Sequence, residues 1–211
     1  MISIGKVGKI IITKNLKNQI DYYHKQNPGK EWSGILFFKQ TNGDIEKLKD
    51  LEFTATNVYL MDIGSETFTS FKIKDEIVKA YEVIGDKNLE SLTGLIHSHQ
   101  NMTAFFSGTD IQELKDNAKS YYFYISLVVS TTERYVCKII IPTITKIKSE
   151  HEFRNNLGEL KKIVTIDEKE DFLDGDLEIE FEETIIIPEW VKNRIFEIIE
   201  NKKSKEILNV N

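Results

Sequence analysis

Residues Leu92 to Asp110 read LTGLIHSHQNMTAFFSGTD, and they say more about the molecule than any other part of the chain. They open with an apolar run typical of a buried β-strand, which ends in His97 and His99. Alternate strand residues point to the same side, so both imidazoles should face one spot. Asp110 comes eleven residues after His99, at the start of an expected helix. Two imidazoles and one carboxylate form a three-ligand zinc set with a fourth position left free, which a hydrolytic zinc needs.

Each part of this stretch also has a simpler interpretation. An isolated strand histidine is more often a hydrogen-bonded structural residue than a metal ligand, and for a pair the two interpretations are about equally good. Ser107 and Asp110 form a Ser-x-x-Asp pattern ahead of an apolar periodic segment, which is typical of a helix capping box. Taken alone, capping is the better interpretation of this pattern. Ser107 can cap the helix and still face the site, whereas Asp110 is less able to serve both roles.

Outside this stretch, the titratable residues carry weaker signals. Glu31 stands at the start of a predicted strand, Trp32–Phe38, after a Pro-Gly turn. A glutamate there is by default a solvated charge, so its candidacy depends on the histidine and aspartate residues further along the chain. His24 and His151 have no paired ligand at metal spacing and are predicted to be surface residues.

Composition indicates an ordinary soluble globular protein. The 211 residues are 40% hydrophobic and 29% charged, with a net charge of −6, and no Lys/Arg cluster suggests a nucleic-acid groove. No apolar run approaches the roughly 20 residues of a membrane span, and the N-terminus lacks the features of a signal peptide. The single cysteine, Cys137, excludes an intramolecular disulfide and is expected to be a small buried thiol in a strand. These features favour a cytoplasmic protein.

Strand and helix patterns alternate along the first two thirds of the chain. Strands are expected at Val7–Thr13, Trp32–Phe38, about 45–62, Leu92–His99, Tyr121–Val129 and Tyr135–Ile141. Helices are expected where apolar residues recur at Leu16, Ile20 and Tyr23, at Ile73, Ile77, Tyr81 and Ile84, and at Ile111, Leu114 and Ala118. Turns are expected at Asn42-Gly43 and at Glu133-Arg134, and Gly85 should cap the second helix. The pattern predicts an α/β fold, with one mixed β-sheet flanked by helices.

The chain changes character after Pro142. Residues 143–166 have poor periodicity, and residues 167–183 are strongly acidic, with a turn expected at Asp174-Gly175. Pro188 stands where the first turn of a helix would be, and the apolar stripe of that helix starts at Val191. We therefore expect a domain over residues 1–142, and a C-terminal extension of strand and helix over residues 143–211, packed on that domain.

Five of these residues together resemble a known pattern. Glu31 followed by H-S-H-x7-S-x-x-D, as His97, His99, Ser107 and Asp110, is similar to the JAMM motif of the MPN/JAB (JAB domain) zinc metalloprotease family. By this resemblance His97, His99 and Asp110 bind one zinc ion, and Glu31 is the general base. Ser107 would help to stabilise the tetrahedral oxyanion.

The resemblance extends over about residues 5 to 141. Glu31–Leu36 matches the family's E-x-x-G-x-L, Gly94–His99 resembles its histidine strand, and Thr103–Asp110 resembles the run that closes the motif in ubiquitin-cleaving members. Gln100 departs from the pattern, because the family usually has proline directly after the second histidine. That departure changes a loop rather than a ligand, so it bears on the substrate class more than on activity.

The resemblance implies a cytidine-deaminase-like MPN/JAB fold and a zinc-dependent metalloprotease or isopeptidase. The substrate would be an amide or isopeptide bond in a protein tail, that of ubiquitin or a ubiquitin-like modifier. Two alternatives stay open: a bacterial or phage processing peptidase with another protein substrate, and an inactive MPN-type scaffold in a protein complex. A metal-dependent nuclease would need a basic groove or more carboxylates, and neither is evident. We expect no nucleic-acid or membrane partner, and the sequence does not indicate an oligomeric state.

Overall fold

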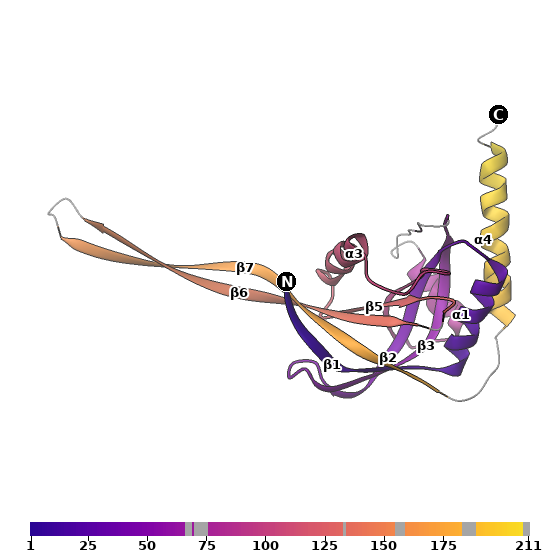
Figure 1. Cartoon of the computed structure of the whole chain (residues 1–211), viewed down its shortest axis with the longest axis horizontal. Helices are drawn as coiled ribbons and strands as arrows, with labels where there is room; N and C mark the ends of the chain where they lie inside the picture. The colour runs from indigo at the N-terminus through magenta and orange to yellow at the C-terminus, as the bar shows by residue number, and fades with distance from the viewer. Residues whose placement is uncertain (66–68, 70–75, 133, 155–158, 183–188, 209–211) are drawn as a thin grey trace.

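The computed structural model describes residues 1–65, 69, 76–132, 134–154, 159–182 and 189–208. Within these residues, strands and helices alternate as predicted for an α/β protein (Figure 1). The elements are β1 (Ile2–Ile12), α1 (Lys14–Gln26), β2 (Trp32–Asp44), β3 (Lys49–Ile63), α2 (Ile77–Ile84), β4 (Leu92–Ser98), α3 (Gly108–Ala118), β5 (Tyr124–Val129), β6 (Val136–Arg154), β7 (Leu160–Phe181) and α4 (Glu189–Leu208). The α/β class is therefore confirmed.

The strands form one mixed sheet that closes into a barrel in the order β1-β3-β2-β4-β5-β6-β7. The pairs β1/β3, β1/β7 and β4/β5 are parallel, and the other neighbours are antiparallel. β7 completes the barrel because it pairs with β6 on one side and with β1 on the other, where Ile10 lies opposite Ile179. The mixed sheet was predicted, but its closure was not, since β7 comes from the segment expected to be an extension.

Alternate residues of the strands supply two separate layers of packing. One set forms the core inside the barrel, for example Ile96 in β4 and Leu127 in β5, and α1 packs on this core. The other set faces outward. On this outer side α3 covers Leu95 and Tyr124, and α2 covers residues of β2 and β3. β5 is consequently buried at every position, as predicted for a strand covered on both faces.

Past the barrel, β6 and β7 continue as a long two-stranded ribbon (Figure 1), which we call the arm. It consists of Thr143–Arg154 paired with Leu160–Asp171. Apolar side chains on it are largely solvent-exposed, including Ile144 at 60% and Ile166 at 63%. Within the segment that the sequence left as mixed strand or helix, residues 143–154 and 160–166 thus lie in the two strands β6 and β7. The boundary predicted at residue 142 falls inside the uninterrupted β6, and the division into domain and extension stays a prediction.

Two predicted turns are wrong. Asn42-Gly43 lies inside β2, and the turn between β2 and β3 comes at residues 45–48, although Gly43 has the positive φ (+84°) that suggested a turn. Asp174-Gly175 lies inside β7. Gly175 serves close packing there, because a Cβ at this position would stand only 2.8 Å from a methyl carbon of Val7.

Other predicted features agree with the structure. Gly85 ends α2 with φ +79°, and Cys137 is buried in β6, where burial raises the pKa of its thiol. Val191 is buried and α4 packs on the barrel, as expected for an apolar stripe. Ile73, Glu133 and Pro188, which also figured in the predictions, lie outside the described residues. No helix in the described part of the chain is long and apolar enough to span a membrane.

Candidate metal centre

The two histidines project from the outer face of the barrel toward α3. β4 places Leu95 on this outer face, against α3, and Ile96 on the inner face. Because side chains alternate along a strand, His97 and His99 share the side of Leu95. His97 lies opposite Ser33 of β2 on one side, and the backbone N–H of His99 donates to the carbonyl of Val129 at 2.8 Å on the other.

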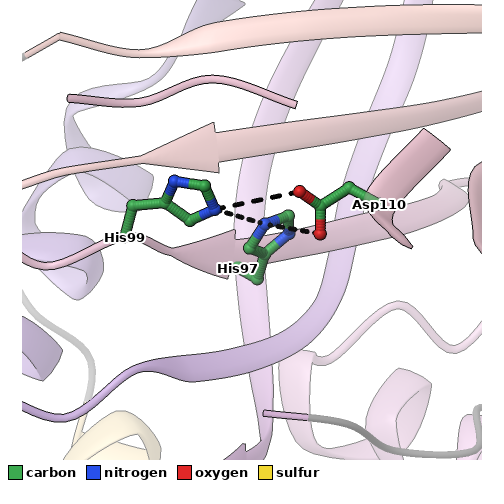
Figure 2. Close-up of side chains that lie close together, drawn as sticks. All are labelled: His97, His99 and Asp110. Carbon is green, nitrogen blue, oxygen red and sulfur yellow. Dashed lines mark hydrogen bonds and ion pairs between the residues drawn. The ribbon is translucent and has the colours of Figure 1, made fainter. Parts of the chain in front are cut away.

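Asp110, near the start of α3, completes a compact group with the histidines (Figure 2). The two Nε2 atoms of His97 and His99 are 3.2 Å apart, and carboxylate oxygens of Asp110 lie 3.4 Å from the first and 3.9 Å from the second. Ligands placed about 2.0–2.1 Å from a tetrahedral zinc ion would be separated by roughly 3.3–3.4 Å. The donor set and its spacing therefore fit one such ion, and the predicted grouping of His97, His99 and Asp110 is present.

Burial favours the protonation state that metal binding needs. His97 and His99 are each 6% exposed. Burial lowers the pKa of His97 well below its usual value, against the opposing influence of the Asp110 carboxylate. Burial thus favours the neutral form of the His97 imidazole, which is the form that binds a metal ion.

Asp110 both caps α3 and faces the histidines. The Ser107 hydroxyl accepts from the Asp110 N–H at 3.2 Å, and the Asp110 Oδ2 atom accepts from the Ser107 N–H at 2.7 Å, so the capping box is complete. Oδ1 lies toward His97. Asp110 was expected to be less able to serve both roles, yet its carboxylate takes part in the cap through Oδ2 and lies close to both histidines. The cap fixes the carboxylate that completes the metal group.

Glu31 is a buried residue beside this group rather than a solvated strand end. It is 5% exposed and lines the same cleft as His97 and Asp110. Its N–H donates to the Ser65 carbonyl at 2.7 Å, and its own carbonyl accepts from the Gly64 N–H at 2.8 Å. Burial first, and the Asp110 charge second, raise the pKa of the Glu31 carboxyl to about 7. A carboxyl group with this pKa can both take up and release a proton near neutral pH.

The cleft has a volume of about 630 Å³ and includes residues that sequence reasoning did not single out. The ring of Phe105 packs edge-on against that of His99, with centroids 4.9 Å apart, and Phe105 is half exposed at the cleft. Glu113 also lines the cleft, and burial, followed by the Asp110 charge, raises its pKa. Its spacing of three residues from Asp110 in a predicted helix was the signal that could have placed it on the same face.

The prediction for His24 was wrong, whereas His151 is exposed as expected. His24 is buried in α1, and its Nδ1 atom accepts from the indole N–H of Trp32 at 3.4 Å. Burial lowers the pKa of His24 to about 4. It is a structural residue that packs against the strand following Glu31.

Comparison with known proteins identifies the family of the chain. Residues 13–139 match the family described as prokaryotic homologs of the JAB domain, and the chain belongs to that family. Among solved structures, protein DSY2949 from Desulfitobacterium hafniense is similar, with 19% sequence identity and a TM-score of 0.44 over 83% of this chain and 94% of that one. No match was found among curated proteins.

Proposed function

We propose that this protein is a zinc-dependent hydrolase that cleaves an amide or isopeptide bond in a protein tail. The observation that carries the proposal is the convergence of His97, His99 and Asp110 in one cleft with the buried carboxyl group of Glu31. Membership of the prokaryotic JAB family supports the same chemistry. A cytidine-deaminase-like arrangement of the sheet and a cytoplasmic location belong to this proposal.

His97, His99 and Asp110 would hold the metal, and Glu31 would move the proton. When bound, zinc supplies Lewis-acid polarisation of the substrate carbonyl and lowers the pKa of a bound water. The Glu31 carboxylate takes a proton from the attacking water and returns it to the departing amine. A positioned general acid–base group of this kind contributes about 10²–10⁴-fold to the rate.

Ser107 would stabilise the negative charge that develops on the carbonyl oxygen. Its backbone N–H is engaged by the Asp110 carboxylate, and its hydroxyl oxygen accepts from the Asp110 N–H. The hydroxyl hydrogen is therefore the group that Ser107 has left to donate. A single donor at such a position typically contributes about 2.7–4 kcal/mol to transition-state stabilisation.

The substrate we propose is the tail of ubiquitin or of a ubiquitin-like modifier, with a bacterial or phage processing substrate as the alternative. The opening beside the metal group is lined by Met102 and Phe105, both exposed, which offer apolar contact to an extended peptide. A protein tail without its own secondary structure could enter such a cleft in extended form.

The test is cleavage of fusion proteins that carry modifier tails, by the zinc-loaded protein and by two variants. We expect Glu31→Gln to keep the metal and to lose about 10²–10⁴-fold in turnover. Glu113→Gln is the matched control, because it neutralises a second carboxyl group in the same cleft. If Glu31→Gln cleaves as fast as wild type, the assignment of the base is wrong. If zinc binds and no tail or peptide is cut, a scaffold role replaces the hydrolase.

A further inference from the structure

The tetrapeptide His97-Ser98-His99-Gln100 presents its residues alternately to two environments. The histidines line the metal cleft, whereas Ser98 and Gln100 do not, and these two are 0% and 4% exposed. Buried polar groups in proteins almost always have hydrogen-bond partners, so the contacts of Ser98 and Gln100 indicate what they hold in place.

Ser98 contacts the peptide group that follows Glu31. The backbone N–H of Trp32 donates to the Ser98 hydroxyl oxygen at 2.9 Å. Trp32 is the first residue of β2, and its side chain is fully buried in the barrel core. The Ser98 hydroxyl therefore ties the start of β2 to the end of the strand that bears the histidines.

Gln100 contacts the peptide group that precedes Glu31. Its side-chain N–H donates to the carbonyl of Lys30 and, at 3.3 Å, to that of Asn27. Gln100 is itself held by Thr131, whose N–H and hydroxyl donate to its carbonyl at 2.9 and 3.0 Å. Its φ of +42° lies in the left-handed region that most residues avoid, so these contacts fix an unusual backbone.

We propose that Ser98 and Gln100 are positioning residues for Glu31. Within four consecutive residues, His97 and His99 would hold the metal, and the two residues that alternate with them would set the place of the base. The Gly64 and Ser65 backbone holds Glu31 from its other side, so its main chain is fixed on both flanks. This inference rests on the proposed role of Glu31 as general base.

If Ser98 and Gln100 position Glu31, substituting either residue should affect kcat and leave KM and zinc affinity nearly unchanged. A displaced base lowers the rate of the chemical step while leaving metal binding and substrate binding in place. Ser98→Ala removes the contact with Trp32, and Gln100→Met removes the contacts with Lys30 and Asn27, each with little change in volume. We expect each to lower kcat about 10–100-fold, with KM and zinc affinity within about threefold of wild type. Ser98→Thr, which keeps the hydroxyl group, should recover most of the loss.

Two control variants separate positioning from a general loss of stability. Ser126→Ala changes an equally buried serine of β5, whose hydroxyl has no hydrogen-bond partner within the described residues. Gln19→Met removes a buried amide that bonds Asn57 and Val58, between α1 and β3. We expect neither control to change kcat, even where Gln19→Met lowers the melting temperature. A loss of kcat in the controls as large as in the two test variants would overturn the proposal.

A double-mutant cycle with Glu31→Gln supplies the sharpest test. If Ser98 and Gln100 act through Glu31, adding Ser98→Ala or Gln100→Met to Glu31→Gln produces no further loss of kcat. The same 10–100-fold loss in both backgrounds would contradict the inference.

Amide hydrogen exchange tests the same inference without activity. The Glu31 amide, which bonds Ser65 and neither substituted residue, should exchange at least tenfold faster in both test variants of the metal-free protein than in the controls. Exchange at the rate of the controls would overturn positioning. If instead exchange accelerates as expected and wild type cleaves no substrate, only the proposed function fails.

Discussion

The metal centre and the arm are both built on strands of the same sheet, yet they differ in what these strands pack against. At the metal centre, β4 and its neighbour β5 are covered by the barrel core on one face and by α3 on the other. In the described residues of the arm, β6 and β7 pair only with each other and leave Ile144 and Ile166 exposed. An isolated two-stranded ribbon is marginally stable at best in water. Packing on both faces is thus what allows the barrel, and not the arm, to hold side chains at fixed distances.

Truncating one apolar side chain in each region should have the largest difference in effect on stability. Leu127→Ala removes a fully buried side chain from β5, and we expect the free energy of unfolding to fall by about 2–5 kcal/mol. Ile144→Ala removes a side chain that is 60% exposed, and we expect a change within about 0.5 kcal/mol. Urea denaturation of both variants measures the two values. Equal losses would mean that the arm is packed against something in solution.

Removing one hydroxyl group in each region should have a smaller effect on stability, which again differs between the metal centre and the arm. Ser107→Ala deletes the cap of α3, which should lower the free energy of unfolding by about 1 kcal/mol and weaken zinc binding, because the cap places Asp110. Thr165→Ala is the matched change in the arm, where the exposed hydroxyl makes a long contact of 3.5 Å with the Ser149 carbonyl. We expect Thr165→Ala to leave the free energy of unfolding unchanged within measurement error. A Ser107→Ala protein with unchanged stability would show that the cap does not order the helix.

The smallest expected difference between the metal centre and the arm is in how the stability of the metal-free protein changes with pH. The folded-state pKa of Glu31, about 7, lies above its ordinary value of 4.5, so its contribution to stability is complete below pH 4.5 and is lost as the pH rises through 7. Glu31→Gln should therefore match wild type in acid and melt a few degrees higher at pH 8. Glu168→Gln, in an exposed arm ion pair with Lys146, should show no such trend. A difference between Glu31→Gln and wild type that does not change with pH would contradict a buried carboxyl group.

The sequence allowed more of the barrel to be predicted than of the arm, for the same physical reason. β5 is buried on both faces and reads as an unbroken apolar run, and the i, i+2 spacing of His97 and His99 reveals a shared face. In the arm the exposed strands carry mixed charged and apolar residues, so no periodicity marks them. The closure of the barrel was hidden because an acidic segment supplies β7, in which Glu178 and Glu180 form exposed ion pairs with Lys6 and Lys9 of β1.

Within the site, the sequence could not show which residues far apart in the chain lie close together in the fold. Glu31 is separated from His97 by 66 residues, and only the pairing of β2 with β4 makes it a buried neighbour of the cleft. The position of the Asp110 carboxylate between the helix cap and the histidines was also hidden, because it depends on how its two oxygens are oriented at the start of α3.

A metal centre at His97 and His99 is tested by the metal stoichiometry of wild type and of the His97→Ala/His99→Ala variant. Elemental analysis of the purified proteins, after equilibration with zinc and removal of excess, should give about one zinc per wild-type chain and none in the double variant. A His24→Ala/His151→Ala variant controls for loss of histidine as such and should keep the metal. Wild type without bound zinc, or equal zinc in wild type and the His97→Ala/His99→Ala variant, would contradict a metal centre at these residues.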